Sequence, residues 1–248
     1  MNLQLHSRRA LVTSSTAGIG LAIEQALAAG GAEVSLRGRS QNRVDEAAAT
    51  IRKTAQAAGA AENVRGIAAD LSTAAGIETL ISQIDDLEIL VNNLGIFEIQ
   101  PFEKITDVDW MKMFETNVMS GVRLSRRYLP EMLKKTCGRI VFISSESAVQ
   151  IPTEMIHYGM TKTAQLAVAR GLAQLTSGTN VTVNSVLAGP TMSEGVGKFV
   201  SDIAKSKNVS ATEVERDFFK TMRPTSLLQR FTSTAEVGNQ GPRASLSS

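Results

Sequence analysis

The chain has a single cysteine, Cys137, among 248 residues, so no disulfide can form within one chain. This scarcity favours a reducing, cytoplasmic setting. The formal net charge is only +2, which gives no strong attraction to nucleic acid or to a membrane surface. No apolar stretch approaches the length of a membrane span, and the first apolar run stops too early for a signal peptide. No His/Cys/Asp cluster has the spacing of metal ligands. We therefore expect a cytoplasmic protein with no metal, nucleic acid or membrane partner.

Apolar runs alternate along the chain with segments of helical periodicity. The expected strands span residues 9–14, 32–38, 63–70, 87–93, 138–145 and 180–189, and the expected helices span 18–31, 41–59, 74–84, 107–135 and 158–175. This alternation predicts an α/β fold in which helices cover both faces of a parallel sheet. We expect a doubly wound sheet of Rossmann type, with its ligand at the carboxyl ends of the strands.

The segment after the first expected strand, "VTSSTAGIG" at residues 12–20, places small residues just before a helix. Free backbone N–H groups and the helix dipole favour a bound phosphate at such a place. Gly18 and Gly20 would let the backbone approach that ligand closely. An ordinary turn between a strand and a helix is the alternative interpretation.

The second expected strand ends in "RGRS", with Arg37 and Arg39 near the place where NAD-binding sheets usually carry an acidic residue. No carboxylate stands there to repel a 2′-phosphate, and guanidinium groups pair well with phosphate. The pattern favours NADP(H) over NAD(H). The alternative is that both arginines are only surface charges.

Tyr158 and Lys162 are four residues apart in "YGMTK", so a helix presents them on one face. A free tyrosine has a pKa of about 10, and a nearby ammonium and a positive nicotinamide would both favour its phenolate. The pair could then exchange a proton near neutral pH, although this spacing alone arises often by chance. Ser144 and Ser145 end a strand upstream, and Asn117 lies within an expected helix, where asparagine is a modest helix former.

Together these motifs resemble the short-chain dehydrogenase/reductase family, in its 3-oxoacyl reductase-like branch, over about residues 9–230. "TSSTAGIG" is similar to the family's cofactor loop, "AADLS" to the end of its adenine-pocket strand, "NNLG" to its Asn-Asn-Ala-Gly segment and "VNSVLAGPTMS" to its Pro-Gly segment. The family's serine precedes its tyrosine by thirteen positions, which selects Ser145 over Ser144. The resemblance implies a catalytic set of Asn117, Ser145, Tyr158 and Lys162. It implies cofactor contacts at Ser14, Ser15, Thr16, Gly18, Ile19, Gly20, Arg39, Asp70, Leu71, Asn92, Gly95, Tyr158, Lys162, Gly189 and Thr191.

The resemblance also implies NADP(H)-dependent hydride transfer between a nicotinamide and a carbonyl or alcohol carbon of a small molecule. Tyr158 would donate or accept the proton, and Lys162 would lower the pKa of Tyr158 and hold the nicotinamide ribose. Ser145 would bond the substrate oxygen, and Asn117 would hold a water that links Lys162 to solvent. A cofactor-binding sensor and a catalytically impaired, truncated reductase are the alternatives.

Single residues of the chain depart from the family pattern at three places. Ser14 stands at the first glycine of the loop, where a positive φ would cost of order 1 kcal/mol. Small residues at this position in some family members favour a negative φ instead. Ala188 replaces a proline and Leu94 replaces an alanine, and both changes look mild because Gly189 and Pro190 keep the turn chemistry.

The end of the chain departs further. Family members usually continue with a helix and a seventh strand, whereas residues 238–248 are small, polar and rich in turn formers, which predicts a disordered tail. We therefore expect one dinucleotide-binding domain over residues 1–237, with six strands and a substrate lid at 192–229. A truncated chain, a frame change near Val237 or a second chain covering the gap would each explain the end. The resemblance implies a homodimer through the helices near 107–135 and 158–175.

Three further side chains lie beside the catalytic set in the sequence. His157 is expected to be structural or to lie at the pocket wall, because neighbours on a helix do not share a face. Glu146 is expected to be exposed or in an ion pair. Glu154 lies in the loop before Tyr158, where such enzymes meet substrate, and its role in specificity stays open.

Overall fold

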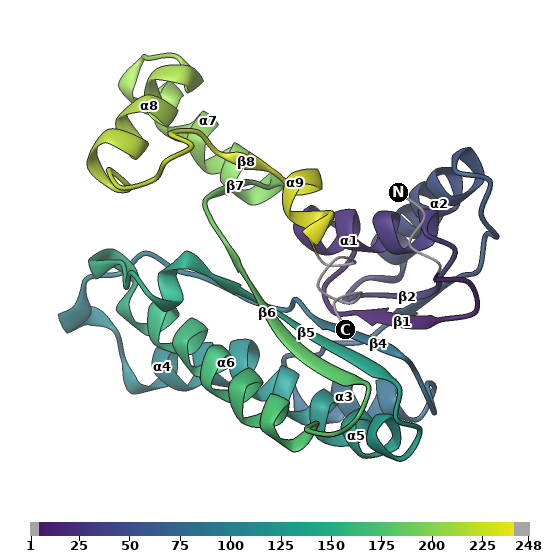
Figure 1. The fold of residues 1–248 in the computed structure, drawn as a ribbon. Helices are drawn as coiled ribbons and strands as arrows, with labels where there is room; N and C mark the ends of the chain where they lie inside the picture. The colour runs from purple at the N-terminus through teal and green to yellow at the C-terminus, as the bar shows by residue number, and fades with distance from the viewer. Residues whose placement is uncertain (1–4, 241–248) are drawn as a thin grey trace.

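A six-stranded parallel sheet forms the centre of the molecule (Figure 1). The computed structural model describes residues 5–240. The strands of this sheet are β1 (Arg9–Val12), β2 (Glu33–Gly38), β3 (Val64–Ala68), β4 (Ile89–Asn92), β5 (Gly138–Ser145) and β6 (Val181–Ala188). Their order is β3-β2-β1-β4-β5-β6, and every neighbouring pair is parallel. The sheet confirms the predicted six-stranded, doubly wound Rossmann fold, and β6 is an edge strand.

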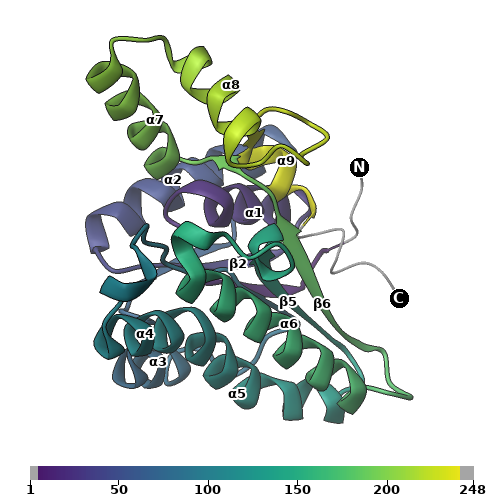
Figure 2. The ribbon, with the colours of Figure 1, turned by 90° about the vertical axis from the view of Figure 1, so that its left-hand side faces the viewer.

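Helices cover both faces of the sheet (Figure 1 and Figure 2). On one face, Leu27 and Ile51 join the inward side chains of β1 and β2 in one core, and on the other face Leu124 and Tyr128 join a second core. β1, β4 and β5 are buried almost throughout, as their apolar runs require between two helical layers. The helices of this body are α1 (Gly18–Ala29) and α2 (Gln41–Ala57) on the first face, and α3 (Ala74–Ile81), α4 (Asp107–Phe114), α5 (Ser120–Lys134) and α6 (Ile156–Leu175) on the second.

The expected helix over 107–135 is divided into three segments. α4 begins with a capping box, in which the Thr106 hydroxyl accepts from the Asp109 N–H and the Asp109 carboxylate accepts from the Thr106 N–H. Between α4 and α5, the five residues Glu115–Met119 form the π-helical turn η2. Single π-turns inside helices occur frequently at functional sites, and this one contains Asn117.

A separate excursion of the chain carries the segment predicted as a lid (Figure 1). It leaves through β7 (Thr191–Met192), forms α7 (Glu194–Lys207) and α8 (Ala211–Thr221), and returns through β8 (Thr232–Ser233). β7 and β8 pair as a two-stranded parallel sheet that the sequence did not predict. The excursion has its own small core of Val200, Val214, Phe219 and Phe231. Figure 2 shows α7 and α8 projecting beyond the body of the molecule.

The short helix α9 (Thr234–Gly238) follows β8 and packs on α1. A Cβ on Gly238 would lie 2.6 Å from the Cβ of Ala22, so the close approach of the two helices requires glycine. Gly238 is also the first residue of the predicted tail and here belongs to a helix. The part of that tail from residue 241 onward lies outside the described residues.

Candidate active site

The catalytic and cofactor candidates gather where the strands of the main sheet end. Ser14, Arg39, Asn92 and Ser145 follow or close β1, β2, β4 and β5 respectively. In a parallel sheet the carboxyl ends of all strands lie at the same end of the sheet, and a doubly wound fold binds its ligands there.

The loop between β1 and α1 is tied down by Ser15. Its hydroxyl donates to the Val12 oxygen at 2.9 Å and accepts from the Arg37 N–H at 2.9 Å, and its own N–H donates to the Arg37 oxygen at 2.9 Å. Ser15 is fully buried. It therefore fixes the loop to β2, and its hydroxyl already makes two hydrogen bonds within the protein.

Ser14 adopts the left-handed conformation, with φ of +55°. The expectation of a negative φ at this position is therefore wrong. Its backbone oxygen accepts from the Asn93 side-chain amide at 3.1 Å, and that amide also donates to the Thr13 oxygen at 3.0 Å. The loop thus holds a serine in the left-handed conformation that glycine adopts most easily, and Asn93, quoted only as part of "NNLG", fixes it there.

The first turn of α1 fits a phosphate. Its N-cap, Ala17, makes no side-chain hydrogen bond to the helix, so the N–H groups of that turn have no capping side chain. Gly18 has φ of +60°, and a Cβ on Gly20 would overlap the Ser14 oxygen. Together with the helix dipole, this uncapped start fits the phosphates of a dinucleotide. Thr16 and Ile19 lie in the same segment.

The two arginines at the end of β2 have different environments. Arg37 is fully buried, its Nη1 donates to the Leu36 oxygen at 2.6 Å, and burial lowers its pKa to about 10. It therefore cannot meet a ribose phosphate, contrary to the expectation that either arginine could. Arg39 is exposed and makes no ion pair within residues 5–240.

Three candidate cofactor-binding residues lie at the ends of β3 and β4, and their surroundings differ. The Asp70 carboxylate accepts from the Ser72 hydroxyl and N–H at 2.7 and 3.1 Å, and these bonds lower its pKa. Leu71 is buried. The Asn92 side chain turns toward α5, where it donates to the Ser125 hydroxyl at 3.2 Å. The side-chain oxygen of Asn92 is buried and has no hydrogen-bond partner among the described residues.

Asn117 lies at the centre of a buried polar network. Its side-chain oxygen accepts from the Ile96 N–H at 2.8 Å, and its side-chain nitrogen donates to the Ile96 oxygen at 2.9 Å and to the Thr161 hydroxyl at 3.0 Å. A Cβ on Gly95 would lie 3.5 Å from Lys162 Nζ and 3.7 Å from Asn117 Oδ1. The segment after β4 is thus fixed against η2 and α6, beside the catalytic lysine.

Lys162 is joined to Asn117 by a residue that the sequence analysis did not consider. Lys162 Nζ donates to the Ile143 oxygen at 2.9 Å and to Gln165 Oε1 at 3.2 Å, and Gln165 Nε2 donates to the Asn117 backbone oxygen at 2.6 Å. Burial lowers the pKa of Lys162 to about 8. A polar residue three positions after the lysine, on the same helix face, was the signal in the sequence.

Tyr158 projects from the first turn of α6 beside Ser145. Its ring centroid lies 5.7 Å from Lys162 Nζ and 6.2 Å from the exposed ring of Phe97. Burial raises the pKa of Tyr158, and the Ser145 hydroxyl partly offsets that rise. The expectation that Lys162 lowers the pKa of Tyr158 is therefore not met in the protein alone, where Ser145 and Arg223 are the groups that lower it. The Ser144 hydroxyl donates to the Lys162 backbone oxygen at 3.0 Å and so ties the end of β5 to α6.

The remaining candidates border this centre. Gly189 and Thr191 follow β6, and the Thr191 hydroxyl donates to the Gly189 oxygen at 2.9 Å and bonds the Thr232 hydroxyl at 3.0 Å. Thr191 therefore joins β7 and β8, the two strands at which the lid begins and ends. His157 is fully buried, with its ring 5.9 Å from that of Trp110, which fits the structural role expected for it.

Two carboxylates beside the catalytic pair contact the lid. Glu146 and Glu154 both form ion pairs with Arg223, at 2.9 and 3.3 Å. The expectation of an ion pair at Glu146 is confirmed. No pattern in the sequence pointed to Arg223, because its partners lie about 70 residues away along the chain.

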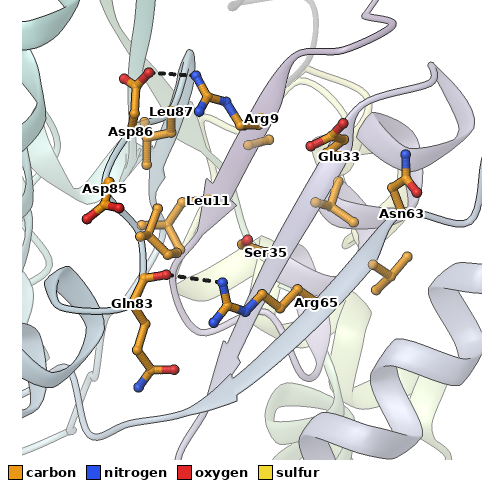
Figure 3. A pocket seen from close by; sticks show the side chains of 14 residues that line it. Arg9, Leu11, Glu33, Ser35, Asn63, Arg65, Gln83, Asp85, Asp86 and Leu87 are labelled. Atoms are coloured by element: carbon orange, nitrogen blue, oxygen red, sulfur yellow. Dashed lines mark hydrogen bonds and ion pairs between the residues drawn. The ribbon is translucent and has the colours of Figure 1, made fainter.

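A pocket of about 520 Å³ opens at the opposite end of the sheet, near the first residues of the strands (Figure 3). It is bordered by Arg9 and Glu33, the first residues of β1 and β2. Arg9 pairs with Asp86, and Arg65 donates to the Gln83 oxygen at 3.1 Å. The pocket is therefore remote from the carboxyl ends that carry the catalytic set.

No described helix is long and apolar enough to cross a membrane.

Known proteins resemble this chain in sequence and in structure. A family model described as "short chain dehydrogenase" matches residues 8–204. Uncharacterized oxidoreductase YvrD of Bacillus subtilis (strain 168) is 45% identical over 242 residues, which are 96% of this chain and 89% of that protein. The 3-oxoacyl-(acyl-carrier-protein) reductase FabG of Aquifex aeolicus (strain VF5) is 31% identical over 191 residues, or 76% of each chain. L-Sorbose reductase from Gluconobacter frateurii, complexed with NADPH and L-sorbose, superposes with a TM-score of 0.88 at 27% identity, over 100% of this chain and 92% of that one.

Proposed function

The chain belongs to the short chain dehydrogenase family and is an NAD(P)-dependent oxidoreductase, and on that premise we propose that NADP(H) is its preferred cofactor and Tyr158 its proton donor and acceptor. The observation that carries the proposal is the convergence of Tyr158, Ser145 and Lys162 at the carboxyl edge of the sheet. The substrate is a small carbonyl compound or alcohol.

Three of the protein's own residues act in this reaction. Tyr158 donates the proton to the substrate oxygen, and a nicotinamide held at this site would supply the hydride. Ser145 bonds that oxygen and stabilises the charge that develops on it. Lys162, held by Ile143 and Gln165, places a positive charge near the phenol and favours its ionised form when the proton is transferred.

The preference for NADP(H) is supported by Arg39, which is exposed and free of ion pairs within residues 5–240. The structure of L-sorbose reductase was determined with NADPH, in agreement with this proposal. Replacing Arg39 with Ala should raise the KM for NADPH about tenfold, since a charge-assisted phosphate contact contributes on the order of 1.5–3 kcal/mol. The KM for NADH should change little, and equal losses for both cofactors would contradict the assignment.

The decisive experiment compares the wild type with Tyr158→Phe. NADPH oxidation is followed against a panel of ketones, quinones, sugars and acyl thioesters, and cofactor binding is measured separately by NADPH fluorescence. We expect the variant to bind NADPH normally and to lose turnover at least 100-fold, in line with general-acid catalysis. Equal turnover would refute the role of Tyr158. Wild-type cofactor binding without turnover would favour a sensor or an impaired reductase.

We also propose a homodimer through α4, α5 and α6. The proposal is supported by the dimers that family members form and by large apolar side chains that are exposed on these helices. Val108 and Met111 of α4 are 74% and 63% exposed, and Leu175 of α6 is 64% exposed. Sedimentation of the purified protein measures the oligomeric state directly.

A further inference from the structure

We propose that Arg223 is a positioning residue that fixes the lid (β7 through β8, residues 191–233) against the segment that joins Ser145 to Tyr158. Arg223 lies directly after α8 and its side chain is almost fully buried. The inference rests on the proposed function for its kinetic consequences, but the contact itself is a property of the folded chain.

The two partners of Arg223 lie at the two ends of the segment that joins Ser145 to Tyr158. Arg223 Nε donates to Glu146 Oε1 at 2.9 Å, and Glu146 follows Ser145 in the short helix η3 (Glu146–Ala148). Arg223 Nη1 donates to Glu154 Oε1 at 3.3 Å, and Glu154 lies in η4 (Thr153–Met155), directly before α6 and Tyr158. One guanidinium therefore connects the lid to the segment that carries Ser145 and to the segment that carries Tyr158.

The lid side of this contact is equally well anchored. Arg223 Nη1 also donates to the Met222 oxygen at 2.7 Å, and the guanidinium lies 5.7 Å from the ring centre of Phe218. Phe218 stacks on Phe231 and contacts Phe219, both of which belong to the lid core. A displacement of Arg223 would therefore displace the packed core of the lid with it.

Two other polar contacts between the lid and the body are exposed to water. Arg43 pairs with Glu194 at 3.0 Å, and both side chains are more than half exposed. Thr225 bonds Gln150 at 3.3 Å on the surface. Exposed contacts of this kind add little to stability because water and salt screen them. Thr191 and Thr232 bond Gly189 and Pro190, but only at the base where the lid joins the body. Among the described residues, the Arg223 cluster is thus the buried polar link away from that base.

The cluster also acts on the proton donor. Ser145, Glu146 and Arg223 all influence Tyr158, and Lys162 lies on its other side. Glu146 raises the pKa of Tyr158 and Arg223 lowers it. With Arg223 removed, the unpaired charge of Glu146 would raise the pKa of Tyr158 further, which a purely structural role of Arg223 would not do.

The test uses the NADPH-loaded enzyme and its best carbonyl substrate. Arg223→Gln should raise the substrate KM about tenfold, change kcat less, and move the alkaline limb of the pH profile to higher pH. Arg223→Lys should recover most of the KM. Glu154→Gln should raise KM by a smaller factor and leave the alkaline limb in place, because Glu154 does not act on Tyr158. Arg216→Gln, at an exposed arginine of α8, is the control.

A second readout does not depend on turnover. A lysine-specific protease should cut the lid of Arg223→Gln, at exposed Lys205, Lys207 and Lys220, several-fold faster than that of the wild type or of Arg216→Gln. Wild-type KM, pH profile and cleavage rate in Arg223→Gln would overturn the proposal. If the wild type turned over no carbonyl compound, the proposed function would fail, while the cleavage rates would still decide the role of Arg223.

Discussion

Glu24 should destabilise this protein increasingly as the pH rises. It lies on the inner side of α1 and is fully buried. Ser15, the buried Arg37 and the Val12 backbone favour its ionised form, but the effect of burial outweighs theirs. Burial raises the pKa of Glu24 from 4.5 to about 8. At neutral pH the folded protein therefore holds a neutral carboxyl group, whereas the unfolded chain ionises it.

The sign and size of the effect follow from that pKa difference. Below pH 4.5 both states are protonated and Glu24 costs nothing in ionisation; between pH 4.5 and about 8 only the unfolded state gains by losing the proton. Each unit corresponds to about 1.36 kcal/mol, so the loss of stability is about 3 kcal/mol at pH 7 and about 5 kcal/mol above pH 8. Glu24→Gln keeps the shape and removes this loss.

The assay is thermal unfolding of wild type and Glu24→Gln from pH 5 to pH 9. We expect the variant to melt roughly 6–12 °C higher at pH 7, at 2–4 °C per kcal/mol for a domain of this size. The gap should be small at pH 5 and should widen up to about pH 8. Glu46→Gln, at an exposed glutamate of α2, should show no such trend. A gap that is constant with pH, or a less stable Glu24→Gln protein throughout, would refute the reasoning.

Two further predictions concern the active site. Ser14→Gly should add up to about 1 kcal/mol to the free energy of unfolding in denaturant, by removing left-handed strain, with little change in NADPH affinity because φ is already +55° in the protein alone; a loss of stability would contradict the strain. Gln165→Leu should lower kcat about tenfold, the scale of a lost hydrogen bond to a charged group, and lower the pKa of Lys162 further, whereas Gln174→Leu at an exposed site of α6 should match wild type in kcat and pH profile.

Local sequence signals sufficed for the elements of the fold. The buried runs of β1, β4 and β5 are continuous in the sequence because helices cover both faces, and their periodicity is unlike that of α2. The same signals missed the β7–β8 pair, because two-residue strands have no periodicity. The interruption of the expected 107–135 helix at η2 was also missed, because a π-turn differs from an α-turn only in how its backbone bonds.

The sequence by itself indicated the chemistry that we propose, because Ser145, Tyr158 and Lys162 follow one another at spacings that one strand and one helix translate into proximity. Only the tertiary structure decided which side chains of each element are buried and which are exposed. It buried Arg37 and left Arg39 exposed. These outcomes depend on contacts between segments far apart in the chain, and no local pattern encodes such contacts.

The same division explains the residues that gained roles only in three dimensions. Gln165 reaches the backbone of Asn117 across two helices, and Arg223 reaches Glu146 and Glu154 across the lid boundary. Glu24 occupies a helix position that its neighbours enclose completely. A side chain's partners, burial and pKa are fixed by packing between elements, so they follow from the folded chain and not from its order of residues alone.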